Sequence, residues 1–149
     1  INRYPCNFVL SNLISVAGIG RQGKVPNNFS NFGSKSIHLA APGKDIVSTW
    51  IGEPDATESK TGSSQAAPYV TAALVLTKIK FSSLNKALVQ YLRYACNVKP
   101  NNEMQVKHGP LNLTNVLSDQ TMQAFLKSIG KSDQKDETLF NLKKGKKKK

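Results

Sequence analysis

The sequence is short of cysteine, of long apolar runs and of aromatic residues, which make up 7% of its 149 residues. Two cysteines, Cys6 and Cys96, are too few for a disulfide-rich scaffold, although the sequence leaves open whether they pair with each other. No apolar run reaches the roughly eighteen residues of a transmembrane helix. The opening segment Ile1–Pro5 has neither an initiator Met nor the apolar stretch of a signal peptide. We therefore expect an internal or C-terminal piece of a longer protein.

Acidic residues are also scarce, because nine Asp and Glu stand against 21 Lys and Arg, a net charge of +12. Residues 1–117 carry a net charge of +7, and the run Lys143–Lys149 alone carries +6. Such a run is typical of a solvated tail, and no aromatics lie between its lysines to stack on bases. We expect no specific nucleic-acid binding. Contact with an anionic surface, without sequence readout, is the alternative use of the tail.

The hydrophobic fraction of 39% is enough for a packed core, and its first half is arranged in short runs. Three of these runs, rich in β-branched or small apolar residues, predict strands: residues 13–19, 37–41 and 46–51. The turn pair Pro42-Gly43 ends the second run. The small polar residues of 52–62 predict a loop or an irregular hairpin.

Helical patterns follow in the second half. Residues 64–79 are apolar nearly all the way round, which predicts a helix buried on most sides. Residues 84–95 follow an amphipathic spacing with Ser83 as a plausible cap, and residues 97–110 are expected to form a loop. A last helix is predicted over 119–129, capped by Ser118 and stopped by Gly130, followed by a disordered tail. Strands followed by buried helices indicate a layered α/β fold.

Chemistry is most strongly indicated where the long helix begins. A turn of small residues leads Ser64 onto the first helical turn, and Pro68 is tolerable there only if the helix starts close to Ser64. Free backbone N–H groups and the positive end of the helix dipole would favour an oxyanion at this point. An ordinary N-cap is the common use of a serine at a helix start, and spacing alone favours a cap by Ser63 or Ser64.

Nine residues at this point, Gly62-Ser63-Ser64-Gln65-Ala66-Ala67-Pro68-Tyr69-Val70, resemble the nucleophile motif of subtilisin-like serine proteases, Gly-Thr-Ser-Met-Ala-(Ser/Ala/Thr)-Pro-His-Val. The resemblance implies that Ser64 is the nucleophile and that its backbone N–H lines the oxyanion hole. Ser63 replaces a Thr whose hydroxyl can assist that hole. Gly62 and Pro68 match the motif, whereas Gln65 replaces its Met, and Tyr69 replaces a His that is outside the triad.

Four further blocks resemble the family in its own order. They are Tyr4-Pro5 with Asn12–Ala17, Phe29–Gly33, Leu39–Gly43 with Ile46–Thr49, and Lys107–Asn112 with Val116-Leu117. The resemblance implies the C-terminal portion of a three-layer fold with a mostly parallel sheet and a buried central helix that starts near Ser64. Residues 1–117 would form this part of the peptidase domain. Residues 118–149 would be a helical extension with a Lys-rich tail.

The family works by a Ser-His-Asp triad. The resemblance places the Asp, the His and the oxyanion Asn upstream of Tyr4, outside this chain. His38, His108, Asp45 and Asp55 match no triad position. We therefore expect a serine endopeptidase acting on polypeptides through an acyl-enzyme on Ser64, completed by the N-terminal part of the domain in cis or as a separate fragment. This chain alone would be inactive or nearly so.

The alternative is a pseudoprotease or binding module that keeps the fold and uses its basic tail on anionic surfaces. The changes at Gln65 and Tyr69 and the lack of the upstream segments motivate it. Calcium and a secreted or extracytoplasmic location are implied by family resemblance alone, and no carboxylate-rich loop here matches a calcium motif. A zinc site of Cys6, Cys96, His38 and His108 has no supporting ligand spacing. The isolated chain is expected to expose an apolar face.

Overall fold

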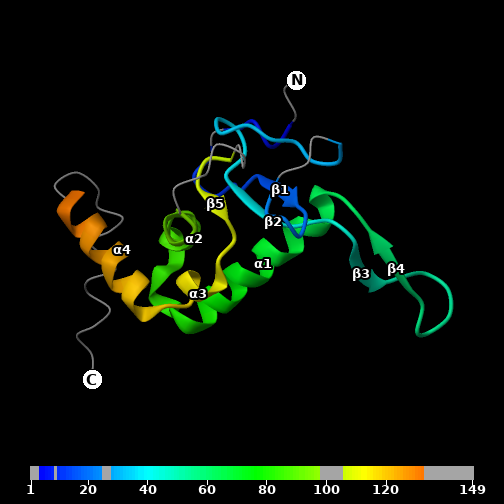
Figure 1. Ribbon diagram of the computed structural model, residues 1–149. Coiled ribbons are helices and arrows are strands. Elements are labelled where there is room, and N and C mark those ends of the chain that lie inside the picture. Colours follow the sequence, from blue (N-terminus) through cyan, green and yellow to red (C-terminus); the bar gives the residue numbers. More distant parts are fainter. Residues whose placement is uncertain (1–3, 9, 25–27, 98–105, 133–149) are drawn as a thin grey trace.

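The computed structural model describes residues 4–8, 10–24, 28–97 and 106–132. The Lys-rich run Lys143–Lys149 and most of the loop predicted at 97–110 lie outside these residues. Figure 1 shows a small parallel sheet beside a group of helices, with a hairpin that extends away from both. The predicted α/β class is confirmed.

The main sheet has three parallel strands in the order β1-β2-β5. They are β1 (Val16–Ile19), β2 (Leu39–Pro42) and β5 (Gly109–Pro110). The first two match the predicted runs, although both are shorter, and Pro42-Gly43 ends β2 as expected. The third strand lies in a segment predicted as a loop. With two residues, β5 is too short to show a strand pattern of its own.

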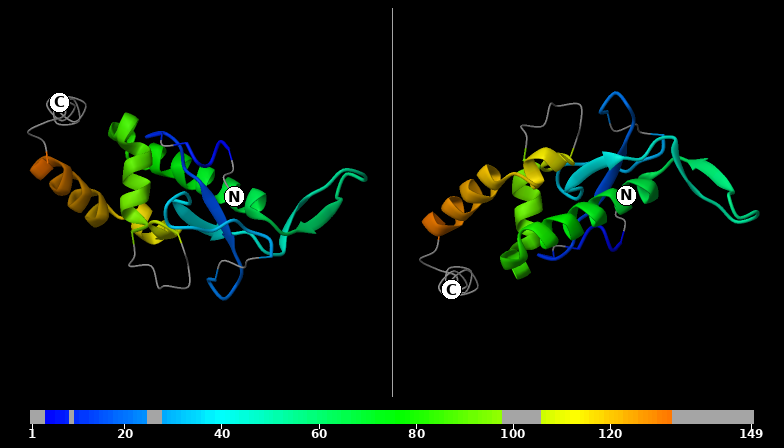
Figure 2. Two further views of the ribbon diagram at one scale, coloured as in Figure 1. Left: turned by 90° about the horizontal axis from the view of Figure 1, so that it is seen from above. Right: turned by 90° about the horizontal axis from the view of Figure 1, so that it is seen from below.

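The third predicted strand is not part of this sheet. Strands β3 (Ile46–Thr49) and β4 (Thr57–Lys60) pair antiparallel with each other, so of the two structures predicted for residues 52–62, a loop or a hairpin, the hairpin is present. Figures 1 and 2 show this hairpin projecting from the body of the molecule. Its large apolar residues Val47, Trp50 and Ile51 are accordingly exposed.

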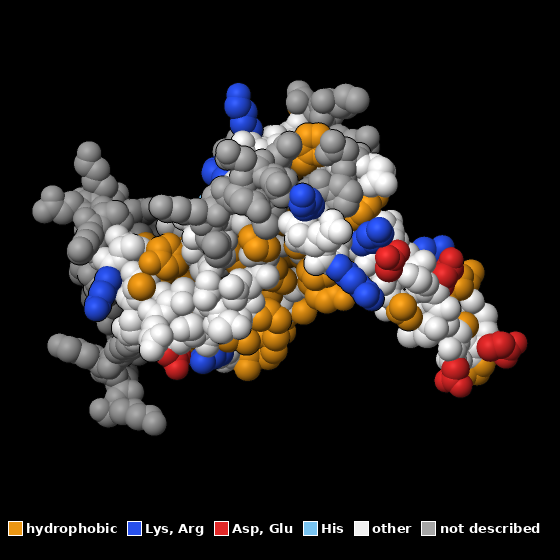
Figure 3. Space-filling view, in the orientation of Figure 1, with side chains coloured by type: hydrophobic (Ala, Val, Ile, Leu, Met, Phe, Trp, Pro, Cys, Tyr) orange, Lys and Arg blue, Asp and Glu red, His pale blue; other side chains and the backbone are white. Residues whose placement is uncertain are grey.

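The long helix α1 (Ser63–Lys80) packs against β1 and β2. It is buried on one face, through Ala66, Val70, Ala73 and Thr77, rather than on most sides. The sheet covers only that face, so Tyr69, Val75, Leu76 and Ile79 stay exposed. Figure 3 shows hydrophobic side chains gathered in this region of the surface. The expected exposed apolar face is therefore present.

The next helical segment differs from its prediction. A 3₁₀ helix η1 (Ser82–Ala87) precedes α2 (Leu88–Ala95), in place of one helix over 84–95. Asn85 interrupts it with φ 37°, a left-handed conformation that Asn adopts more readily than most residues. The predicted cap at Ser83 is wrong, because neither element has a side-chain cap.

The C-terminal helices complete the fold. Helix α3 (Leu113–Val116) is one short turn, and α4 (Asp119–Ser132) begins where the last helix was predicted. The predicted cap is confirmed, because Ser118 Oγ accepts a hydrogen bond from the Thr121 N–H at 3.3 Å. Gly130 does not stop α4, which continues to Ser132.

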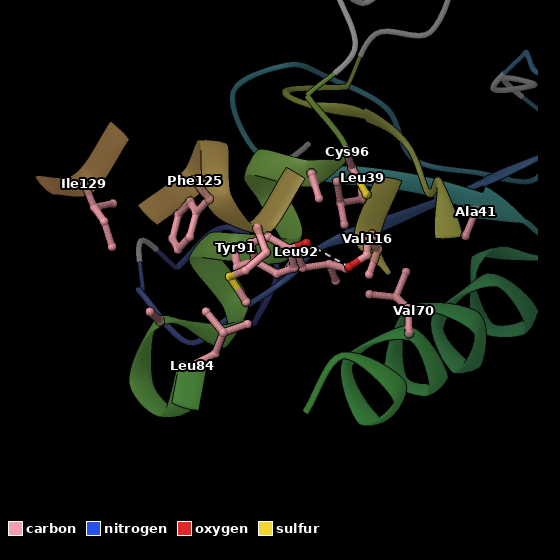
Figure 4. Close-up of a cluster of buried hydrophobic side chains, with 14 of the residues drawn as sticks. Leu39, Ala41, Val70, Leu84, Tyr91, Leu92, Cys96, Val116, Phe125 and Ile129 are labelled. Carbon is pink, nitrogen blue, oxygen red and sulfur yellow. Dashed lines mark hydrogen bonds between the residues drawn. The ribbon is translucent and has the colours of Figure 1, made fainter. Parts of the chain in front are cut away.

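The sheet separates two clusters of buried side chains. Leu39 and Ala41 of β2 face the helices, whereas Ala40 points the other way and packs with Ala17 and Val106. This alternation is the two-residue period of a strand. Figure 4 shows the larger cluster, in which residues of α1, η1, α2, α3 and α4 meet, together with Cys96 at the end of α2: Val70, Leu84, Tyr91, Leu92, Cys96, Val116, Phe125 and Ile129.

Candidate active site

Helix α1 begins in a way that excludes a capping role for either serine. Its N-cap is Gly62, and no side-chain hydrogen bond caps the helix. Ser63 and Ser64 are therefore the first two helical residues, and Ser64 is exposed. The first helical turn contains no acidic residue, while Lys78 and Lys80 lie in the last turn. The positive end of the helix dipole therefore lies at Ser64 without a local carboxylate to offset it.

The turn before Ser64 is tied to the carboxyl ends of the parallel strands. The Gly62 N–H donates to the Gly43 carbonyl at 2.8 Å, and the Gly43 N–H donates to the Ile19 carbonyl at 3.0 Å. The Gly62 carbonyl accepts from the Gln65 N–H at 3.1 Å as the chain enters α1. Ligand sites in α/β sheets commonly lie at this edge.

Two glycines that sequence reasoning did not assign to the site allow this close approach. A Cβ at Gly43 would lie 2.7 Å from the Gly62 oxygen and 2.8 Å from the Gly18 Cα. A Cβ at Gly18 would lie 3.3 Å from the Gly62 oxygen. Backbone atoms cannot yield as a flexible side chain can, so position 43 requires glycine, whereas at position 18 a Cβ would be tightly placed against the Gly62 carbonyl. The Pro42-Gly43 turn signal marked one of them, but only as the end of a strand.

The remaining motif residues surround the turn. The Gln65 side chain folds back toward Gly62, since its Oε1 would lie 2.9 Å from a Cβ placed on that glycine. Pro68 lies in the second turn of α1, not in the first turn where its presence was expected. Because proline has no N–H, it cannot make the helical hydrogen bond to the Ser64 carbonyl. Tyr69 is exposed.

The two histidines lie at the amino ends of the parallel strands, opposite the carboxyl ends to which the Ser64 turn is attached. His38 and His108 directly precede β2 and β5, and their rings stack with centroids 6.3 Å apart. The five residue steps from His38 to Gly43, along β2, span about 16 Å of extended chain, and Gly43 lies at the end where the Ser64 turn is attached. Neither histidine is therefore placed to act as a base for Ser64.

Both histidines are held in the neutral form. Burial, with nearby positive groups that include Arg93 and Lys107, lowers the pKa of His38 to about 4. The same groups, burial first, lower the pKa of His108. His38 Nδ1 accepts a hydrogen bond from the Ser15 N–H at 3.0 Å, which gives this histidine a structural role.

The other candidate groups do not form a second site. Asp45 accepts from the Thr61 hydroxyl at 3.3 Å and donates its N–H to that hydroxyl at 2.9 Å, so it fixes the end of the hairpin. Cys6 and Cys96 are both free thiols, and burial raises the pKa of Cys96. Among the described residues, no three His, Cys, Asp or Glu side chains gather as metal ligands.

Comparison with known proteins decides the family. The family model described as "Subtilase family" matches residues 3–106. The chain belongs to the subtilase family. Subtilisin-like protease 2 of Plasmodium falciparum is 40% identical over 73 residues, which are 49% of this chain and 5% of that protein. Alkaline protease 1 of Aspergillus flavus is 44% identical over 57 residues, which are 38% of this chain and 14% of that protein.

Solved structures agree with this subtilase assignment. MycP1 from Mycobacterium smegmatis aligns with a TM-score of 0.58 at 25% identity, covering 71% of this chain and 30% of that one. The epidermin leader peptide processing serine protease of Staphylococcus aureus aligns with a TM-score of 0.65 at 23% identity, covering 78% and 32%. The latter likeness shows the fold alone. The chain spans about a third or less of each of these four proteins.

Within the described ranges, none of the helices combines the length and apolarity needed to cross a membrane.

Proposed function

We propose that this subtilase segment carries the nucleophile of a serine endopeptidase and that Ser64 is that nucleophile. The observation that supports this most directly is the placement of Ser64. It is an exposed, non-capping serine on the second residue of a helix whose entry turn is tied to the carboxyl ends of β1 and β2. Capping would give this serine a structural role, and it does not cap the helix.

The proposed reaction uses the positive end of α1. Ser64 Oγ attacks the scissile carbonyl carbon while a base takes the hydroxyl proton, and the oxyanion accepts a hydrogen bond from the Ser64 N–H. The tetrahedral intermediate expels the amine, which receives the proton from the base, and leaves an acyl-enzyme. Water then hydrolyses the ester and restores the serine. The Ser63 hydroxyl is proposed to assist the oxyanion.

The base, its orienting acid and a second oxyanion donor are proposed to come from the N-terminal part of the peptidase domain. Neither His38 nor His108 can supply the base, since both lie at the amino ends of the strands, at the other end of the sheet. The exposed apolar face of α1, which includes Val75, Leu76 and Ile79, is where we propose that this part packs. That face would otherwise hold a large apolar patch in water. An extracytoplasmic location is proposed on family membership.

The test is labelling with a fluorophosphonate, which reacts with activated serines, in the full-length protein. Wild type is expected to react, Ser64→Ala to lose the label, and Ser63→Ala to react more slowly. Ser83→Ala, an exposed serine on η1, is the matched control and is expected to react as wild type does. Residues 1–149 alone are expected to stay unlabelled.

Two results would contradict the proposal. A label that survives Ser64→Ala assigns the nucleophile to another residue. A full-length wild type that folds but does not react favours the pseudoprotease alternative, in which the fold serves binding.

A further inference from the structure

The carbonyl of Gly62, two residues before Ser64, lies in a notch formed by backbone. One side of the notch is Gly43, whose added Cβ would lie 2.7 Å from the Gly62 oxygen. The other side is Gly18 on β1, whose added Cβ would lie 3.3 Å from the same oxygen. The position of the Ser64 turn is therefore determined by where the backbones of β1 and of the β2–β3 connection lie.

Gly18 is itself held in place by a side chain from a distant loop. Its N–H donates to Ser30 Oγ at 2.8 Å, in a buried hydrogen bond that joins residues twelve apart in sequence. Ser30 is 7% exposed, and its hydroxyl donates in turn to the Asn31 carbonyl at 3.0 Å. The Phe29 ring lies against the same glycine, since its Cε2 would be 2.9 Å from a Cβ at Gly18.

This hydrogen bond uses an N–H on the side of β1 that faces away from β2. In the described sheet β1 is an edge strand, with β2 on one side only. The Gly18 N–H points away from β2 and would be a buried donor without a partner if Ser30 were absent. The Ser30 hydroxyl acts both as acceptor, from the Gly18 N–H, and as donor, to the Asn31 carbonyl. The loop that carries Ser30 therefore fixes the position of β1 at Gly18.

We infer that Ser30 is a positioning residue for the Ser64 nucleophile, acting through the Gly18 backbone and the notch that holds Gly62. The inference rests on the proposed function of Ser64. Without the hydroxyl, this buried N–H loses the acceptor that it has in the structure, and β1 can shift relative to the notch as the N–H finds another partner. A shift of this kind changes where Ser64 Oγ lies relative to the scissile carbonyl. Catalysis is sensitive to displacements of about 1 Å.

The experiment measures kcat and KM separately on a peptide substrate, with the full-length protein. Ser30→Ala removes the acceptor, and Ser30→Thr restores it. Gly43→Ala places a Cβ against the Gly62 carbonyl and so displaces the turn before Ser64 directly. Gly20→Ala is the matched control, because a Cβ there would meet only the Lys44 side chain, at 3.5 Å or more. Thermal unfolding of each variant measures folding independently.

Ser30→Ala is expected to lower kcat about 10-fold and Gly43→Ala about 100-fold, both with KM unchanged, because the nucleophile and not substrate binding is displaced. Ser30→Thr is expected to recover most of kcat. Gly20→Ala is expected to behave as wild type does.

A purely structural Ser30 would give a different pattern. If Ser30→Ala lowers the melting temperature while kcat of the folded enzyme stays at the wild-type value, the positioning role is overturned. The positioning role is also overturned if Gly20→Ala, which lies outside the notch, lowers kcat as much as Gly43→Ala does. If Ser64→Ala keeps wild-type activity, the proposed function of Ser64 has failed, and the positioning role fails with it.

Discussion

Helix α4 lies beyond the residues matched by the subtilase model, yet its side chains belong to the main core. Phe125 is the central one. It is 1% exposed, and its ring meets those of Tyr91 and Tyr94 edge-on or tilted, with both centroid distances 5.3 Å. Through this packing α4 is an integral part of the folded unit, and removing the Phe125 ring is expected to release it.

The cost of Phe125→Ala follows from what the ring contacts. The substitution loses the burial of a whole aromatic side chain and leaves a cavity, for a total of about 4 kcal/mol. Each aromatic pair accounts for about 1 kcal/mol of this loss. If local opening of α4 governs exchange of its amides, this free energy corresponds to roughly 1,000-fold faster exchange.

Hydrogen exchange followed by mass spectrometry on the peptide that covers α4 measures this directly. Phe125→Leu keeps most of the volume and is expected to fall between wild type and Phe125→Ala. Lys127→Ala, on the exposed side of the same helix, is the control and is expected to exchange as wild type does. Unchanged protection of α4 in Phe125→Ala would refute the packing described here.

Two further outcomes are expected. Because the pKa of His38 falls from its ordinary 6.5 to about 4 in the folded protein, its contribution to stability is complete above pH 6.5 and is lost as the pH falls toward 4. Urea unfolding at several pH values should show this slope, and His38→Asn, which does not titrate, should reduce it; an equal slope in both contradicts the assignment. Ile79 is 74% exposed, and Ile79→Glu should prevent assembly of residues 1–149 with a separately produced N-terminal part, as followed by size-exclusion chromatography. Lys127→Glu, on α4, should assemble normally, and equal assembly of both variants would remove the docking role of α1.

Several elements could be predicted because the signals that form them lie within a few residues. Pro42-Gly43 ends β2, Ser118 caps α4, and the polar residues between β3 and β4 allow a hairpin. The nucleophile motif belongs to the same class, since its small residues and its serine are consecutive in the chain. Family membership and the entry into α1 near Ser64 followed from these local patterns.

Other features depended on residues far apart in the sequence. Apolar residues on every side of α1 predicted burial on most sides, but the described residues cover only one face, which packs against β1, β2 and the helical elements that follow α1. Asn85, at φ 37°, interrupts an amphipathic pattern that predicts a continuous helix, and the apolar spacing around it contains no signal for this break. Propensity is a weak guide where tertiary packing decides.

The sequence by itself determined the family, the α/β class and the serine on which chemistry was expected. Only the tertiary structure showed that Ser64 is not a cap, and that His38 and His108 precede the strands at the other end of the sheet. It also showed that Gly18 and Gly43 lie against the turn before the serine, and that Ser30 is hydrogen-bonded to Gly18. The reason is physical. A motif specifies backbone conformation over adjacent residues, whereas a notch between two strands exists only after hydrophobic burial has brought those strands and the helix together.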